Sequence, residues 1–167
     1  MSSSERAART VGFVVVAAAA LSLAGCSGFT PVYGGGPDSL ANVALVYGKP
    51  NSRIDQVIYN DLKLRIPEAH GPAPTLTINS HSWSTALTSQ TVTTAQTPQQ
   101  MTVSAEIKLV DVDGKTLFSA TRAETADYNT GAQVLANNQA SADAIKRAAD
   151  LLADTIRLSV LGALKPA

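Results

Sequence analysis

The strongest constraint on the fold is a strict alternation of apolar and polar residues from Met101 to Leu109. Such a period of two places the apolar side chains on one face of a β-strand and the polar ones on the other. Asp113-Gly114 follows closely, and this dipeptide is typical of a tight hairpin turn because both residues tolerate positive φ. The segment therefore predicts an antiparallel hairpin whose second strand runs from Thr116 to about Thr125.

A strand and a helix are expected before this hairpin. Asn42–Tyr47 is rich in strand-forming residues and is followed by a Gly and a Pro, which end strands. Asn51 or Ser52 can then cap a helix with one buried face, which comprises Ile54, Val57, Ile58 and Leu62. Pro67 stops that helix because proline cannot continue the hydrogen-bond ladder.

One more strand is expected around Leu76 and Ile78, which alternate with polar neighbours. Trp83 lies in the opposite phase from Leu76, and this change of phase predicts a bulge or a sheet edge nearby.

The last element is a long helix with one apolar stripe, which comprises Ala144, Ile145, Ala148, Leu152 and Ile156. Its first residue is expected between 131 and 141, and Asp143 is expected in the first turn, where a carboxylate favours the helix dipole. The order β-α-β-β-β-α predicts one α+β domain, with about four mostly antiparallel strands and two helices packed on one face of the sheet.

The chain has a single cysteine, Cys26, which closes the tetrapeptide Leu-Ala-Gly-Cys directly behind an apolar run. Arg6 and Arg9 precede this run, which extends from Val11 to Leu21. A positive start, a short apolar segment and small residues before the cysteine are typical of a bacterial lipoprotein signal. The run is too short to span a bilayer, which needs about 20 apolar residues. We therefore expect residues 1–25 to be removed and Cys26 to carry diacylglycerol and an N-acyl chain.

The remaining chain is expected to form a short leash and one domain. Residues 26–40 contain Gly34-Gly35-Gly36, which favours neither a helix nor a central strand. Residues 41–164 have the length of one ordinary domain. Without residues 1–25 the chain has 11 Lys and Arg (13 minus 2) against 12 Asp and Glu (13 minus 1), so no strong basic charge points to nucleic acid. No thiol remains for a disulfide after lipidation.

The sequence shows no pattern typical of catalysis or metal binding. Neither His70 nor His81 has a carboxylate or another histidine at a metal-ligand spacing. Asp111 and Asp113 flank the hairpin turn, where aspartate is favoured for its hydrogen bonds to the backbone. We therefore expect a binding or assembly protein with no metal and no cofactor other than the acyl chains on Cys26.

A charge-free segment rich in Thr, Ser and Gln extends from Thr88 to Gln100. One interpretation is a polar hairpin that enters a water-lined protein cavity without burying a charge. The alternative is a solvated loop or the ends of two ordinary strands. Under the first interpretation the residues that contact the partner are Thr91, Thr94, Gln96, Pro98 and Gln99.

Two segments carry a resemblance to a known family. Cys26-Ser-Gly-Phe-Thr-Pro-Val-Tyr-Gly34 is similar to the start of the mature LptE (RlpB) lipoproteins, particularly their alphaproteobacterial branch. Ala126-Asp-Tyr-Asn-Thr130, followed by residues 140–156, resembles the closing strand and helix of the same family. The chain departs from the family in having Leu135-Ala136 where Tyr-Ala is frequent.

The resemblance implies a lipoprotein on the periplasmic side of the outer membrane. Such a protein plugs the LptD β-barrel in a 1:1 complex, assists barrel assembly and takes part in lipopolysaccharide transport to the cell surface, without covalent chemistry. Ser27, beside the lipidated cysteine, is compatible with sorting to the outer membrane. Three cations on or near the predicted hairpin are expected to contact lipopolysaccharide phosphates: Lys108, Lys115 and Arg122.

Two other classes of protein also fit the residues. An auxiliary lipoprotein of an ABC-type lipid transport system combines a lipid anchor with a small α/β domain and no catalytic site. A lipid-anchored hydrolase would need a Ser, a His and a carboxylate that converge in one pocket.

Overall fold

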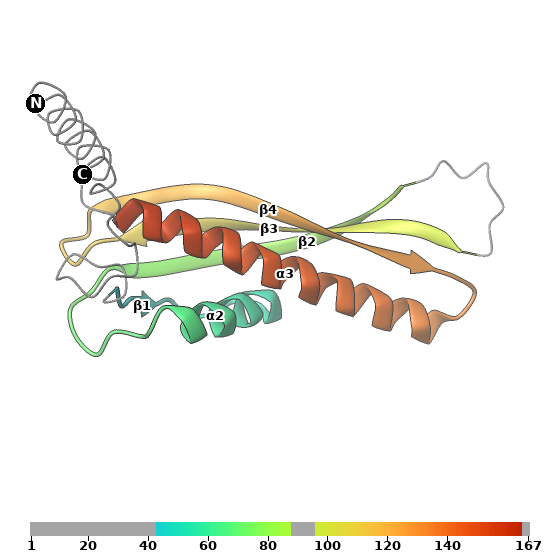
Figure 1. Cartoon of the computed structure of the whole chain (residues 1–167), viewed down its shortest axis with the longest axis horizontal. Helices are drawn as coiled ribbons and strands as arrows, with labels where there is room; N and C mark the ends of the chain where they lie inside the picture. The colour runs from blue at the N-terminus through green and yellow to red at the C-terminus, as the bar shows by residue number, and fades with distance from the viewer. Residues whose placement is uncertain (1–42, 88–95, 165–167) are drawn as a thin grey trace, which may run out of the picture. The chain divides into compact units, whose positions relative to one another are not determined.

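A computed structural model describes residues 43–87 and 96–164 of the chain. In these residues two helices and a four-stranded sheet form the expected order β-α-β-β-β-α (Figure 1). The elements are β1 (Val46–Tyr47), α2 (Arg53–Arg65), β2 (Thr75–Ala86), β3 (Thr97–Val110), β4 (Thr116–Thr130) and α3 (Val134–Leu164). The predicted α+β architecture is confirmed.

The sheet has the order β1-β2-β3-β4 and is antiparallel except at its first pair. β1 is parallel to β2 and pairs only with Thr75 and Leu76. The expected strand Asn42–Tyr47 is thus much shorter, with one isolated bridge from Leu45 to Glu68 before it. Beyond Leu76, β2 has no strand neighbour on its outer side in the part of the chain that is described.

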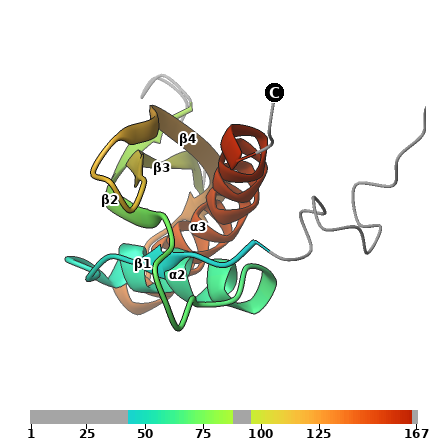
Figure 2. The same cartoon turned by 90° about the vertical axis from the view of Figure 1, so that its left-hand side faces the viewer.

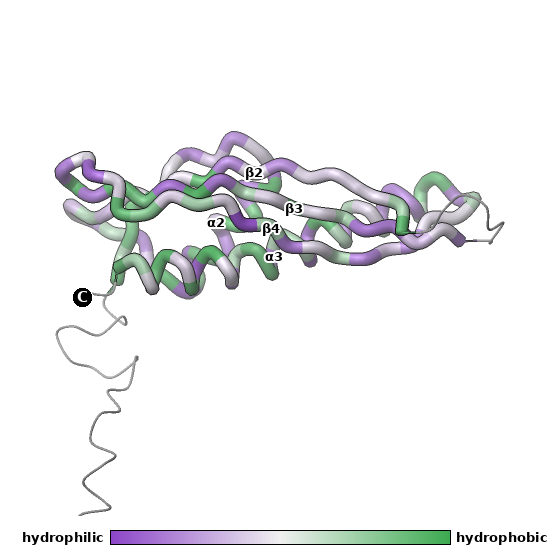
Figure 3. The backbone as a smooth tube through the Cα atoms, turned by 90° about the horizontal axis from the view of Figure 1, so that it is seen from above, coloured by the Kyte–Doolittle hydropathy of each residue, from purple (hydrophilic) through white to green (hydrophobic). Residues whose placement is uncertain are grey.

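Figure 2, which views the sheet along its strands, shows both helices on the same side of it. The side chains on that side form the core, and Figure 3 shows the corresponding alternation of hydrophobic and hydrophilic segments along α3. The predicted inward set of β3 is fully buried: Met101, Val103, Ala105, Ile107 and Leu109. They pack with Leu76 and Ile78 of β2 and with a buried stripe of α3 that comprises Ala144, Ala148, Ala149, Leu152, Ala153, Ile156, Val160 and Leu161.

The hairpin between β3 and β4 lies where the sequence predicts it. The amide of Gly114 donates to the carbonyl of Asp111 at 3.0 Å, and the amide of Asp111 donates to the carbonyl of Lys115 at 2.8 Å. Among the described residues only Gly114 has positive φ, at 80°. The pairing shifts by one residue between Leu109 and Val110, so the turn is combined with a bulge instead of being a two-residue loop.

α2 begins with Ser52 as its N-cap, one of the two predicted caps. Of the predicted face, Ile58 and Leu62 are buried, whereas Ile54 and Val57 are only half-buried. Tyr59 and Asp55 are buried in addition. The helix ends at Arg65, just before Pro67, as expected. The last turn of α2 is joined to α3 by an ion pair between Arg65 and Asp154.

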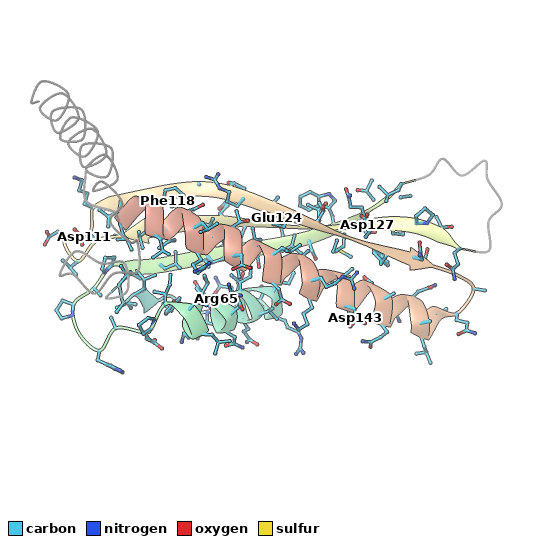
Figure 4. All side chains as sticks on the ribbon, viewed as in Figure 1. Arg65, Asp111, Phe118, Glu124, Asp127 and Asp143 are labelled. Atoms are coloured by element: carbon cyan, nitrogen blue, oxygen red, sulfur yellow. The ribbon has the colours of Figure 1, made fainter. Side chains whose placement is uncertain are left out.

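α3 starts earlier than its charge pattern predicts. Because the helix begins at Val134, Asp143 lies in its third turn, and no acidic residue occupies the first turn (Figure 4). The expectation for Asp143 is therefore wrong; its carboxylate instead accepts a hydrogen bond from Gln139 at 2.9 Å. The predicted apolar stripe is buried except for Ile145, which is half-buried.

Candidate functional site

Several residues singled out in the sequence lie outside the described residues. These are the lipidation residue Cys26 with the whole signal and leash, and Thr91 and Thr94 of the polar hairpin. The remaining hairpin residues are placed: Gln96 is exposed just before β3, while Pro98 and Gln99 are half-buried within it. Residues 97–100 thus belong to a paired strand, as both interpretations of the segment allow.

The three predicted phosphate-binding cations do not converge. Lys108 is exposed on the sheet face that points away from the helices, and Lys115 is exposed beside the hairpin turn. Arg122 pairs with buried Ala105 and therefore belongs to the opposite face from Lys108, because residues directly opposite in a ladder share a face. Its guanidinium donates to the carbonyl of Thr121 at 3.1 Å. One phosphate group cannot contact all three side chains in this arrangement.

The sheet face that the helices leave uncovered is rich in short polar side chains. In β2 and β3 every core residue except Leu109, which precedes Val110, is followed by a Thr, Ser, Asn or charged residue on this face. β4 adds Ser119, Thr121 and Thr125 to the same face. A shallow depression of about 390 Å³ lies on it, lined by Thr77, Asn79, Glu106, Lys108, Ser119 and Thr121, with Ile107 and Ala120 between them. Its volume is within the range of small-ligand sites.

Glu106 and Lys108 provide both charges of the depression. They are two residues apart on β3, so their Cα atoms are separated by about 7 Å. Within the described residues neither takes part in an ion pair or a side-chain hydrogen bond. The two charges offset one another, so the depression has no net formal charge.

An aromatic pair lies beside the depression on the same face. His81 and Trp83 occupy the next two outward positions of β2 after Asn79, and their rings stack with centroids 5.3 Å apart. Trp83 is 46% exposed. Pairing of β2 with β3 is regular through Ala86, so there is no bulge and Trp83 lies on the helix-free face, opposite to Leu76. Of the two predicted features, only the sheet edge is found, because β2 is an edge strand there among the described residues. In the described part of the chain neither histidine has a hydrogen-bonded carboxylate.

The edge of β2 is covered by side chains of α2 over its first half. The Asp55 carboxylate, only 1% exposed, accepts hydrogen bonds from the amide and hydroxyl groups of Ser80. It also accepts from the amides of Asn51 and Ser52, at 3.0 and 2.9 Å, and so completes a capping box. The Tyr59 hydroxyl accepts from the amide of Ile78 at 2.8 Å. These contacts replace a neighbouring strand.

Beyond Ser80 this cover ends. No hydrogen bond to the outer side of Ser82, Ser84 or Ala86 occurs among the described residues. On the helix side, the Ser84 hydroxyl lies 2.8 Å from the hydroxyl of Tyr128 and 3.2 Å from the side-chain oxygen of Gln99. The far half of the sheet therefore carries polar side chains on both faces, and its β2 edge has no hydrogen-bonded neighbour among the described residues.

Two tyrosines lie under the covered edge. The Tyr47 hydroxyl donates to the carbonyl of Ile66 at 2.8 Å, and its ring packs edge-on against Tyr59. Burial, helped by the charge of Glu68, raises the pKa of Tyr47 to about 12. Burial likewise raises the pKa of Tyr59. Both phenols remain protonated at neutral pH and act as hydrogen-bonding parts of the core.

Two further properties bear on function. Within residues 43–87 and 96–164, no cluster of three or more potential ligands could hold a metal ion. None of the helices in these ranges has the length and hydropathy that a bilayer crossing requires.

Sequence reasoning identified Lys108 but not the environment that the fold builds around it. Glu106 was placed correctly on the polar side of its strand, yet only the strand pairing shows that Asn79 and Thr121 flank it. Asp55 gave one signal, a Ser-x-x-Asp capping pattern, which does not reveal that the carboxylate also reaches Ser80.

Solved structures with similar folds were found. Rare lipoprotein B from Shewanella oneidensis has a TM-score of 0.54 and 16% identity, covering 72% of this chain and 93% of that chain. A minor lipoprotein from Acinetobacter baumannii has a TM-score of 0.57 and 16% identity, covering 76% of this chain and 98% of that one. At these identities the likeness concerns the fold. No curated protein matches the sequence.

The family comparison extends over most of the chain. The model of the LptE lipopolysaccharide-assembly family matches residues 40–160, which include every described helix and strand of the domain except the last turn of α3. The chain therefore belongs to the LptE family of lipopolysaccharide-assembly proteins.

Proposed function

We propose that this protein is a lipid-anchored component of the outer membrane that plugs the LptD β-barrel, assists its assembly and takes part in moving lipopolysaccharide to the cell surface. The observation that carries the proposal is the family match over residues 40–160. The proposed role needs no covalent chemistry by the protein itself.

The surface of the domain fits a plug. A plug must present hydrogen-bonding groups to the polar interior of a barrel while its own core stays apolar. The helix-free sheet face and the far half of the sheet offer hydroxyl and amide groups with few charges. The small number of charges favours insertion into the barrel, because each charge taken out of water without a partner costs several kcal/mol.

The anchor is proposed from the sequence alone. Cleavage after Gly25 and acylation of Cys26 would tether the mature protein on the periplasmic side of the outer membrane. Growth with labelled palmitate should label the full chain and not the Cys26→Ala variant, with Thr30→Ala as the control that keeps the lipidation signal. Equal labelling of the Cys26→Ala variant would contradict lipidation at this residue.

The test of the partner is affinity purification of the lipidated protein from detergent-extracted membranes, with identification of the copurifying chain by mass spectrometry. A stoichiometric large outer-membrane β-barrel is expected. An inner-membrane permease would instead support an auxiliary protein of an ABC-type lipid transport system.

The polar hairpin offers a finer test of the same complex. Single cysteines placed from Thr91 to Gln99, combined with cysteines in the barrel lumen, should form disulfide crosslinks. Cysteine at Lys146, which lies on the exposed side of α3 and pairs with Asp150, provides a comparison position in another element. If no position in the hairpin is trapped, the hairpin does not contact the barrel.

Phosphate contacts by Lys108, Lys115 and Arg122 remain a prediction. Because the three side chains lie apart, each would meet a different phosphate. Replacement of all three by Ala should weaken lipopolysaccharide binding, and each single replacement should contribute independently. Unchanged affinity of the triple variant for lipopolysaccharide would contradict the predicted phosphate contacts.

A further inference from the structure

The depression on the helix-free sheet face places Lys108 in surroundings that the phosphate role given above does not explain, and the assignment below takes the place of that role for Lys108. The depression holds one acidic and one basic side chain, four short polar side chains and a neighbouring aromatic stack. We propose that this depression binds a neutral sugar unit of a glycan, with His81 and Trp83 as the stacking surface for the adjoining unit. The inference rests on the proposed function only for the source of the glycan, the saccharide part of lipopolysaccharide.

The lining matches the hydrogen-bonding needs of sugar hydroxyl groups. Each hydroxyl both donates and accepts, so it is satisfied best by a mixture of donors and acceptors. Glu106 offers acceptors, Lys108 offers donors, and the Thr, Ser and Asn side chains of β2 and β4 offer both. Asn79 is held in place by Asn51, whose side-chain amide donates to its oxygen at 2.9 Å.

The charges favour a neutral ligand over a phosphate. A phosphate site normally gathers several cations or backbone amides, whereas here the carboxylate of Glu106 lies two residues before Lys108 on the same face of β3. Glu106 would repel a phosphate that Lys108 attracts. The same two groups do not oppose one another when they bind neighbouring hydroxyls of one sugar ring.

The aromatic pair extends the site along β2. A tryptophan ring offers a flat apolar surface together with a polar N–H group, a combination that suits the mixed surface of a sugar ring. Stacking on His81 restrains the Trp83 ring, so less side-chain freedom is lost on binding. The rest of this face is too polar to form an apolar protein interface.

Trp83 is the only tryptophan in the chain, so its fluorescence reports directly on this surface. The full lipidated chain would be studied in lauryldimethylamine oxide, a detergent without a sugar headgroup. Maltotriose, glucose 1-phosphate and inorganic phosphate would be titrated in parallel, and saturation-transfer NMR would detect contact even if the fluorescence does not change.

Maltotriose should produce a saturable signal, and inorganic phosphate should neither produce it nor compete with it. Glu106→Ala and Lys108→Ala should each weaken binding about tenfold, the effect of losing a hydrogen bond to a charged group. Asp113→Ala and Lys146→Ala remove an exposed acid and an exposed base elsewhere and should leave the affinity unchanged. Purified lipopolysaccharide should compete with maltotriose if it is the source of the glycan.

Three results would overturn the proposal. Binding only of phosphate-bearing probes would make Lys108 a phosphate contact instead. Sugar binding that survives both Glu106→Ala and Lys108→Ala would place the sugar elsewhere. A lack of any contact by NMR with the purified lipidated chain, when the same chain still copurifies the β-barrel from membranes, would remove the glycan site while leaving the proposed function intact.

Discussion

At the residue scale, Tyr47 shows how burial makes stability depend on pH. Its pKa of about 12 in the folded protein exceeds the value near 10 of an exposed tyrosine. Between pH 10 and 12 the unfolded chain therefore loses a proton that the folded chain keeps, so the free energy of unfolding falls as pH rises. Below pH 10 the contribution is fully present.

The matching prediction compares the native chain with Tyr47→Phe in urea denaturation from pH 8 to 12. The difference in unfolding free energy between the two should decrease above pH 10, by up to about 2 kcal/mol. Phenylalanine cannot ionise, so the variant lacks this part of the alkaline loss. A difference that stays constant over the whole range would show that Tyr47 ionises equally in both states.

At the element scale, Asp55 joins the start of α2 to the edge of β2. Asp55→Ala removes a carboxylate that is only 1% exposed and that accepts from the amides of Asn51, Ser52 and Ser80. We expect the free energy of unfolding to fall by roughly 2–4 kcal/mol. Asp55→Asn should also destabilise the fold, since the amide group would direct a donor toward other donors.

The control for this loss is Glu68→Ala. Glu68 forms an ion pair with Lys63 at 2.9 Å in which both side chains are largely exposed, so its removal should cost less than about 1 kcal/mol. Equal effects of Asp55→Ala and Glu68→Ala in urea denaturation would show that the buried carboxylate has no special role.

The contacts of α2 with the edge of β2 also predict that the rate of amide hydrogen exchange changes abruptly along β2. The amides of Ile78 and Ser80 bond to Tyr59 and Asp55, whereas those of Ser82 and Ser84 point to the same side without a partner in the described part of the chain. Ser82 and Ser84 should therefore exchange much faster than Ile78 and Ser80. Asp55→Ala should remove the protection of Ser80. Uniform protection along β2 would contradict the open edge.

At the scale of the whole molecule, both helices and three strands share one core, and its loss should unfold the domain in a single transition. Leu152 and Leu151 are neighbours on α3, but Leu152 is completely buried and Leu151 is 51% exposed. Leu152→Ala should lower the unfolding free energy by about 2–5 kcal/mol, and Leu151→Ala by less than about 1 kcal/mol. Thermal unfolding followed by circular dichroism measures both, and similar shifts would mean that α3 is not packed as described.

Local patterns determined much of this protein. The alternation in β3, the Asp113-Gly114 turn and the apolar stripe of α3 are short-range signals, because a single strand or helix must bury one face wherever it packs. They predicted the element order and the inward residues of β3. The start of α3 at Val134 lies within the predicted range of 131 to 141, but Asp143 is not in the first turn, and β4 continues past the predicted end near Thr125 to Thr130.

Which surface residues lie close together follows only from the tertiary structure, and not from local sequence patterns. The tertiary structure separated Lys108 from Arg122 by placing them on opposite faces, and it brought Glu106, Lys108 and Asn79 to one depression from two strands. It also directed the Asp55 carboxylate to a strand 25 residues away in sequence. Such contacts depend on strand register, and register follows from the packing of the whole core and not from any short segment.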